Sequence, residues 1–481
     1  MLKTVAVRVF AALVIVAVMG VDQSMAGIPG EVAHSAMGGS TLMRTTAQFN
    51  AWTHWIVNEQ NFVELSVGDR AYSPEYFEEE TKAFGSGRGQ GSLHWVYDDS
   101  NHLFFRVRQN DLGGQNINFL WGSTLENIFL SPAGLVSAGG VSYYNAYLEG
   151  QMVNLAWARP LSGGGAFSVG LFFANAGSKS ESEESYSAPG NSGLESEEYE
   201  NKSSAFGGQV TWGNGNGLDL SLSITSESGV RDDIWNESYT EEGDTFIRNI
   251  KQERESDFLN FALAARYEMD SGWIGQLGGI MGSGTRKASY YDFMTDREPD
   301  EVISSTDPDE DISVMGLMVN IGRKLLDTDN AGVTAEFFVN YLKLKWESQE
   351  IFDYEEDEQV VYDQEWNRSE IVVPGTRVAC WTQISKRFQV MAGANAYWNK
   401  STPKWEETLA SYPSEWGSVS AMETSESSER GLIFSYSGGL AFVPNDRVRI
   451  EGQLNMNQLN NLLSLGNTTP LLLRVGGTFV F

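Results

Sequence analysis

The residue types that most often carry acid–base, nucleophilic or metal chemistry are scarce and clustered in this chain. All four histidines lie within the first 102 residues, namely His34, His54, His94 and His102. His94 stands in SLHWVYDDS close to Asp98, a spacing that would bring an acid and a base together. However, the sequence contains neither a GxSxG nucleophile motif nor an HExxH zinc motif. We therefore expect no enzyme activity, no metal site and no cofactor, and we interpret His94 as a structural residue in a short strand.

Charged residues are instead placed at alternate positions of apolar segments. In RVRIEGQLNMN, Val448 and Ile450 occupy one parity, whereas Arg447, Arg449 and Glu451 occupy the other. Successive side chains of a β-strand point to opposite faces, so this pattern predicts a strand with one apolar and one polar face. Across all such segments, the same rule predicts nine charged residues that line a pore: Asp219, Arg266, Glu268, Glu336, Arg377, Arg447, Arg449, Glu451 and Arg474.

Thirteen segments with this alternation lie between Met152 and Phe481. Most are about 9 to 12 residues long, which lets a tilted strand cross a bilayer. Their connections are alternately short and long, and the long acidic loops are predicted at residues 176–202, 229–255, 283–311, 349–368 and 400–429. Short turns on one side and long loops on the other are typical of transmembrane barrels. The predicted fold class is therefore all-β, a transmembrane antiparallel up-and-down β-barrel.

The number of strands depends on the segments upstream of these thirteen. Candidates begin at Asn61, Ser92, His102, Asn116 and Asn127. An odd number of them must be strands if both ends of the barrel lie on the same side of the membrane. We predict sixteen strands, with fourteen and eighteen as the alternatives.

Aromatic residues support a membrane environment for the apolar face. Eight of them lie on that face within a residue or two of a short turn or of the last residue, so in a barrel they share one height. A ring of aromatic side chains is typical of the membrane–water interface. The predicted girdle comprises Trp157, Phe167, Trp212, Tyr267, Trp273, Phe388, Phe442 and Phe481.

Residues 1–26 have the pattern of a secretory signal peptide. Lys3 and Arg8 precede an apolar stretch, and small residues stand at cleavage spacing before Gly27, where we expect the mature chain to begin. Further along, no run of about 18 apolar residues occurs, which argues against helical membrane spans. The chain has one cysteine, which excludes an intrachain disulfide.

A cleavable signal, repeated two-period strands, alternating short and long connections and a last strand ending at Phe481 make this chain similar to Gram-negative outer-membrane β-barrel proteins. The resemblance implies a barrel over residues 61–481 in the bacterial outer membrane, with the short turns in the periplasm. It also implies contact with outer-membrane lipids and lipopolysaccharide. The C-terminal strand is then similar to the signal that the barrel-assembly machinery reads.

Charge and lumen polarity suggest a function. The formal net charge of −31 disfavours nucleic-acid binding, and the acidic loops are expected to be solvated extracellular segments. A polar lumen with both charge signs predicts an outer-membrane channel for passive diffusion of small hydrophilic solutes or ions. Residues 27–60 lack sustained alternation and are expected to enter or cap that lumen.

Two alternatives stay open. Phe172, Ile280 and Met318 are apolar residues with inward parity, which suits a plugged transporter of hydrophobic compounds. Such a protein resembles the long-chain fatty acid transporter family, in which an N-terminal hatch closes a barrel with an apolar pocket, although FNAWTHW lacks the Asn-Pro-Ala motif associated with that family. The other alternative is a non-conducting structural or surface-binding barrel.

Overall fold

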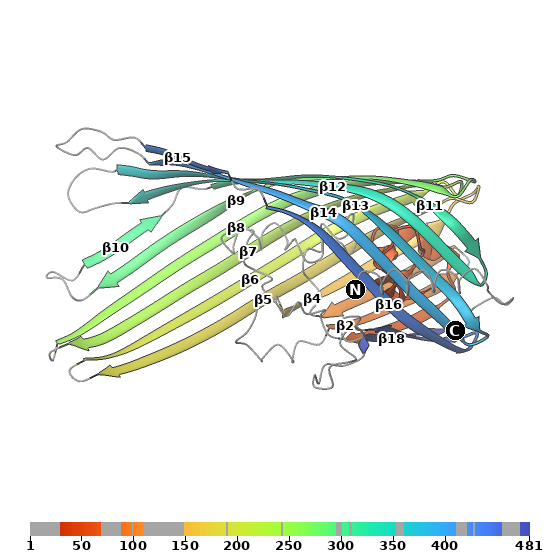
Figure 1. The fold of residues 1–481 in the computed structure, drawn as a ribbon, viewed down its shortest axis with the longest axis horizontal. Helices are drawn as coiled ribbons and strands as arrows, with labels where there is room; N and C mark the ends of the chain where they lie inside the picture. The colour runs from red at the N-terminus through yellow and green to blue at the C-terminus, as the bar shows by residue number, and fades with distance from the viewer. Residues whose placement is uncertain are drawn as a thin grey trace.

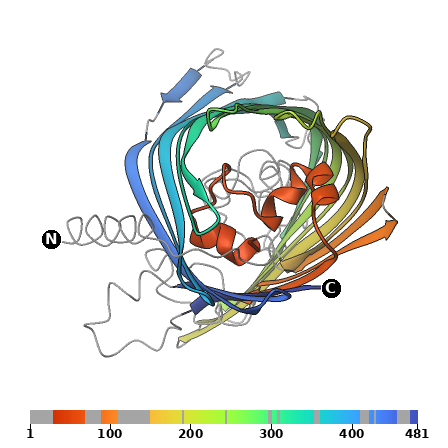
Figure 2. The same ribbon diagram turned by 90° about the vertical axis from the view of Figure 1, so that its right-hand side faces the viewer.

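The computed structural model describes most of the chain as strands. The described residues are 29–68, 88–98, 100–109, 149–188, 191–241, 244–294, 301–306, 310–352, 360–409, 421–426, 429–454 and 472–481. Within these ranges, 18 strands form one antiparallel sheet. β1 pairs with β18 on one side and with β2 on the other, so the sheet closes into a barrel (Figures 1 and 2).

The strands follow one another around the wall in chain order. Their bounds are β1 Phe62–Gly68, β2 Arg88–Asp98, β3 Asn101–Gln109, β4 Glu149–Pro160, β5 Ala166–Ala188, β6 Asn191–Gly213, β7 Leu218–Glu241, β8 Asp244–Glu268, β9 Trp273–Met294, β10 Glu301–Thr306, β11 Glu310–Thr328, β12 Ala331–Phe352, β13 Val360–Ser385, β14 Phe388–Leu409, β15 Ala421–Glu426, β16 Glu429–Asn445, β17 Val448–Leu454 and β18 Leu472–Val480.

Two pairs of strands each share one position in the wall. β10 pairs with β9 as far as Thr306 opposite Ser289, and β11 resumes along the same strand with Glu310 opposite Arg286. β15 and β16 both pair with β14 in the same way. The barrel therefore has sixteen strand positions, which confirms the predicted number.

The sixteen positions also match the predicted segments. The thirteen alternating segments after residue 150 correspond to β4–β9, β11–β14 and β16–β18. The candidates beginning at Asn61, Ser92 and His102 correspond to β1, β2 and β3. Those beginning at Asn116 and Asn127, like the predicted signal peptide, lie outside the described residues.

The long acidic segments differ from the prediction, because the structure extends the strands through them. Residues 176–202 and 229–255 were expected as loops, yet β5 pairs with β6 up to Ala188 opposite Asn191, and β7 with β8 up to Glu241 opposite Asp244. Backbone pairing does not require an apolar face, whereas the alternation of apolar residues ends where both faces become polar. The alternating pattern therefore predicted where the apolar face of each strand ends, but it did not predict that the strands continue beyond that point.

The outer face of the barrel is apolar and exposed over its middle. On β7, Leu220, Leu222 and Ile224 point outward and are exposed, while Ser221 and Thr225 point inward and are buried. This arrangement reverses that of a soluble protein, in which the exposed face is polar. An exposed apolar outer wall fits a surface that is covered by lipid.

Opposite responses to a cation on the two faces of β7 would test this assignment. Leu222→Arg places a charge on the lipid-facing side and should destabilise the folded barrel by about 2 to 4 kcal/mol, whereas Ser223→Arg adds a charge to the inner face and should be tolerated. Urea titration of each variant in phospholipid vesicles measures the difference. Equal losses of folded protein would contradict the assigned faces.

Residues 29–60 lie inside the barrel near its short turns, and we call this segment the plug (Figure 2). It contains the short helix α2 Glu31–Ala36 and two 3-10 helices, η1 Thr46–Asn50 and η2 Thr53–Asn58. No helix among the described residues has the length and apolar character needed to cross a membrane.

Candidate functional site

The plug packs on the wall through two apolar clusters. One cluster joins α2 and the residues after it to β13, β14 and β16, and consists of Ala33, Ala36, Met37, Met43, Ala379, Met391 and Ala441. Two wall glycines permit this close approach. A Cβ on Gly393 would lie 2.3 Å from the Met37 carbonyl carbon, and one on Gly439 would lie 2.6 Å from the Ala36 Cβ. At these two glycines, α2 and the residue that follows it therefore contact the backbone of the wall directly.

Aromatic residues form the core of the second cluster. Phe49 of η1 packs edge-on against Phe104 of β3, with 5.9 Å between ring centroids. Trp52 and Trp55 stack on each other at 6.0 Å and are both buried. Buried aromatic groups of this size contribute several kcal/mol to the packing of a segment. The plug is therefore a packed part of the barrel interior.

Glu451 of β17 binds the start of α2. Its carboxylate accepts hydrogen bonds from the backbone N–H groups of Gly30 at 3.0 Å and Ala33 at 2.9 Å. Arg449 on the same strand donates to this carboxylate and to Gln389. The first N–H groups of a helix have no partner within the helix. A carboxylate from the wall therefore supplies the hydrogen bonds that the sequence of the plug cannot supply itself.

Glu336 of β12 and Arg377 of β13 bind the middle of the plug. Glu336 accepts hydrogen bonds from the Ser40 hydroxyl at 2.5 Å, the Thr41 hydroxyl at 2.7 Å and the Thr41 N–H at 3.1 Å. Arg377 donates to the Gly39 carbonyl at 2.8 Å, and its guanidinium lies 3.6 Å from the Glu336 carboxylate. Both side chains are almost completely buried, so these bonds form away from water.

A third contact lies across the lumen on β7 and β8. His54 of η2 bonds to the Asp219 carboxylate through Nε2 at 2.8 Å and to the Thr211 hydroxyl through Nδ1 at 2.8 Å. Arg266 bridges Asp219 at 3.2 Å and Glu268 at 2.7 Å. The carboxylate of Asp219 is therefore shared between the plug and an arginine of the wall.

The remaining predicted lumen residues are Arg447 and Arg474. Arg474 is buried on β18 and donates to the Ser66 hydroxyl at 3.2 Å. The placement of Arg447 in the lumen was wrong, because it lies exposed in the turn between β16 and β17. Asn445 ends β16 there, and its side-chain oxygen accepts the N–H groups of Arg447 and Val448, which delays the start of the next strand.

Two residues that join the plug to the wall, Arg106 and His54, were not among the predicted site residues. Arg106 of β3 is 1% exposed and donates to the Thr46 carbonyl at 2.8 Å and to the Ser92 hydroxyl at 2.9 Å. His54 of the plug was noted only as one of four histidines in the first 102 residues. Alternation in HLFFRVRQ gives Arg106 inward parity, so that signal was present, whereas the role of His54 depends on a contact between residues 165 positions apart.

The eight predicted girdle aromatics lie on the outer face at the short-turn end. Phe167 is opposite Trp212, and Phe388 is opposite Phe442, whose ring centroid is 4.9 Å away. Trp157 packs edge-on against Phe167 at 5.2 Å. The others, Tyr267, Trp273 and Phe481, are exposed beside turns or at the end of β18.

Taken together, three sides of the wall bind the plug through buried polar groups. Seven of the nine charged residues predicted to line the pore, all except Glu268 and Arg447, are buried. Among the described residues, no group of three or more His, Cys, Asp or Glu side chains is placed to hold a metal ion. Hydrogen bonds and ion pairs therefore join the plug and the wall at this boundary.

No family model matches the sequence, and no curated protein matches it. Solved structures with a similar fold include a Pseudomonas aeruginosa FadL homologue, with 11% identity over 95% of this chain and 100% of that one and a TM-score of 0.37. They also include the ferric yersiniabactin uptake receptor FyuA from Yersinia pestis, at 8% identity over 88% and 80% of the two chains and a TM-score of 0.26. At such scores, function must be argued from this chain's own residues. Its closed sixteen-position wall, apolar outer face and aromatic ring are typical of transmembrane β-barrels.

Proposed function

We propose that this protein is a gated outer-membrane transporter of hydrophobic compounds, in which the plug closes the barrel and must move before a solute passes. One observation carries the proposal. Buried side chains on β3, β7, β12, β13 and β17 bind the plug from around the lumen, through Arg106, Asp219, Glu336, Arg377 and Glu451. A segment held in this way blocks passive flow at the end that we place in the periplasm.

Passive diffusion of hydrophilic solutes through an open lumen receives less support. A porin-like channel needs its charged residues to face water along the path. Here Glu336 and Glu451 are 4% and 3% exposed, and their oxygen atoms already accept hydrogen bonds from the plug. The same residues could face water only after the plug has left.

An apolar band on the inner wall supports hydrophobic compounds as the solute class. It runs over β8, β9, β11, β12 and β13, and joins the same cluster as the plug aromatics Phe49, Trp52 and Trp55. The wall residues of the band are Phe258, Ile280, Val314, Met318, Phe338, Leu342 and Val373. Inward apolar side chains bind apolar molecules and offer nothing to hydrated ions. These wall side chains are 1% to 5% exposed while the barrel is closed, so an apolar solute would meet the band only once the lumen opens.

A reversible tether on the plug would test the gate. Ser40 of the plug and Thr334 of β12 face each other, with their hydroxyl oxygens 3.2 Å apart, so cysteines at these two positions would bring two thiols within reach of a disulfide. In a Cys380→Ala background, the pair Ser40→Cys and Thr334→Cys should lock the plug on oxidation. Entry of the hydrophobic dye 1-N-phenylnaphthylamine into cells should then fall to the level of cells without the barrel, and a reductant should restore it.

The matched control is the single variant Ser40→Cys in the same background, which cannot form the tether and should keep its dye entry on oxidation. Undiminished entry through the oxidised double variant would contradict gating by the plug. Swelling of proteoliposomes in a small sugar with the tether closed would instead favour the passive channel.

A further inference from the structure

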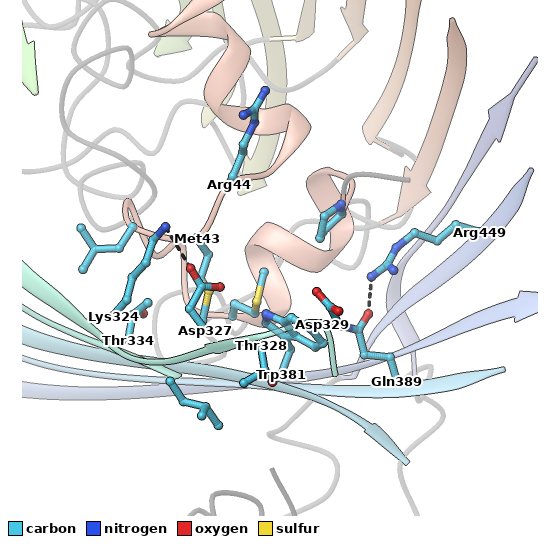
Figure 3. A pocket seen from close by; sticks show the side chains of 14 residues that line it. Met43, Arg44, Lys324, Asp327, Thr328, Asp329, Thr334, Trp381, Gln389 and Arg449 are labelled. Carbon is cyan, nitrogen blue, oxygen red and sulfur yellow. Dashed lines mark hydrogen bonds and ion pairs between the residues drawn. The ribbon is translucent and has the colours of Figure 1, made fainter. Parts of the chain in front are cut away.

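Polar side chains at the short-turn end of the plug are bonded to their neighbours. Figure 3 shows the cavity that plug and wall enclose there. Lys324 pairs with Asp327 at 3.1 Å, and Arg449 donates a hydrogen bond to Gln389. The apolar band of the inner wall, which lies farther from the short turns, differs because it contains polar atoms that have no such partner.

Three buried asparagines of the inner wall have side-chain oxygen atoms with no hydrogen-bond donor in the described part of the chain. They are Asn260 of β8, Asn320 of β11 and Asn340 of β12, and each is between 2% and 4% exposed. A buried acceptor without a donor is destabilising, and folded proteins leave few of them. Three such oxygen atoms on one wall therefore indicate contact with a ligand that donates hydrogen bonds.

Carboxylates fix the orientation of two of these amide groups. The Asn320 Nδ2 donates to Glu336 at 2.9 Å, and the Asn260 Nδ2 donates to Glu227 at 2.9 Å. An ionised carboxylate only accepts hydrogen bonds, so the amide nitrogen must face it and the amide oxygen must face elsewhere. The groups that lack a partner are therefore acceptors, and they cannot be amide nitrogens placed the wrong way round.

Asn320 and Asn340 lie beside each other at the apolar band. Asn340 stands between Phe338 and Leu342 on the inner face of β12, and its backbone is opposite Met318 of β11. Asn320 is the next inward residue after Met318 and is opposite Phe338. Diagonal neighbours of this kind on one face of a sheet are roughly 7 to 8 Å apart. One solute whose apolar body lies on the band can therefore reach either oxygen with a polar group.

The charges beside these two asparagines favour a neutral polar group. Glu336 lies 3.6 Å from Arg377, so the two charges offset each other. A bound ammonium or carboxylate group would add an unbalanced charge to a buried site, which is costly. A carboxylate also brings only acceptors to a place where acceptors already lack donors. A neutral hydroxyl group supplies the missing donor without adding a charge.

We propose that the apolar band selects neutral hydrophobic compounds that carry a hydrogen-bond donor, such as aromatic and aliphatic alcohols, and that their hydroxyl group donates to the side-chain oxygen of Asn340 or Asn320. The inference rests on the proposed function, because a solute meets these side chains only once the lumen opens. It ranks an alcohol above an ether or a carboxylate of similar size and shape.

Three naphthalene probes test this ranking. 2-Naphthol donates a hydrogen bond, 2-methoxynaphthalene only accepts one, and 2-naphthoate is an anion. Their fluorescence measures entry into cells that have the full-length barrel, and the rate in cells without the barrel is subtracted. The barrel-dependent entry of 2-naphthol should be about threefold faster than that of either other probe.

Two contrary results have different meanings. Barrel-dependent entry of 2-methoxynaphthalene or 2-naphthoate as fast as that of 2-naphthol would overturn this inference and leave the proposed transport in place. Entry of all three probes that does not depend on the barrel would overturn the proposed function, and this inference with it.

Substitution of Asn340 then places the donor on the wall. Asn340→Leu removes one acceptor and adds an apolar side chain to an apolar cluster, so the barrel should still fold. The ratio of the 2-naphthol rate to the 2-methoxynaphthalene rate cancels differences in barrel level. It should fall by about threefold in this variant, and Asn340→Gln, which keeps an amide, should retain part of it.

Asn175→Leu is the matched control, because it makes the same substitution on β5 at a residue whose side-chain oxygen already accepts the Gln151 N–H. This variant should leave the ratio unchanged. A ratio that stays the same in Asn340→Leu, or that falls equally in the control, would overturn the assignment of the hydroxyl group to Asn340.

Discussion

Replacing Glu336 by Ala should destabilise the folded barrel by about 3 to 5 kcal/mol, the cost of leaving one partner of a buried ion pair uncompensated. The Arg377 guanidinium would keep the Gly39 carbonyl and Asn395 as partners but lose the Glu336 carboxylate that lies 3.6 Å away. Ser40 and Thr41 would lose the acceptor that holds the centre of the plug. This one substitution should therefore lower the stability of the barrel wall and also loosen the plug inside it.

Urea unfolding in phospholipid vesicles measures the first effect, and hydrogen exchange at residues 39–42 measures the second. Glu268→Ala is the matched control, since it also removes a carboxylate bonded to an arginine. Its side chain is 30% exposed, and Arg266 keeps Asp219 as a partner, so the loss should stay below about 1 kcal/mol.

Adding Arg377→Met to Glu336→Ala should recover part of the stability, because the unpaired buried charge is then gone. The plug should nevertheless stay loose in this double variant, since Gly39, Ser40 and Thr41 regain no partner. If the single and double variants unfold at the same urea concentration, the unpaired charge of Arg377 is not the cause of the lower stability of the Glu336→Ala variant.

The alternation of residues was sufficient to predict the barrel because its signal is local. A strand's two faces repeat every second residue, so the positions of Leu222 and Ser221 follow from a few neighbours. The same rule placed Arg449 and Glu451 on the inner face, where the structure has them buried. The rule misplaced Arg447 because the alternating pattern begins at Arg447, whereas Asn445 holds Arg447 in the β16–β17 turn and the strand itself begins at Val448.

What those inner residues bind could not be predicted in the same way. Glu336 meets Ser40, which is 296 residues away in the chain, and the plug has no periodicity that would orient it against a wall. The strand extensions were missed for a related reason. Their pairing rests on backbone hydrogen bonds, which leave no mark in a stretch such as SKSESEES with two polar faces.

Deleting residues 29–58 should convert the closed barrel into an ion-conducting pore. The wall should keep its sheet, since β1 begins at Phe62, after the deleted residues, and its backbone pairs with that of β18. Planar bilayers should show stepwise conductance with the deletion variant and far less with the full-length protein. Equal conductance in both would mean that the plug does not close the lumen.

The open pore should prefer cations, and we expect the acidic extensions of the strands to cause this preference. The described inner wall buries five carboxylates, Glu64, Asp219, Glu227, Glu336 and Glu451, and five arginines, Arg106, Arg266, Arg377, Arg449 and Arg474, so its charges balance.

Residues 178–202, on the extensions of β5 and β6, have seven Glu and two Lys. Their field reaches the mouth over a Debye length of about 30 Å at 0.01 M salt but only about 10 Å at 0.1 M, so the preference should decline as salt rises. Changing these seven Glu to Gln in the deletion variant should abolish the preference and leave the conductance step in place. A cation preference that survives this change would have to come from the inner wall. Such a result would contradict the conclusion that the charges of the inner wall balance.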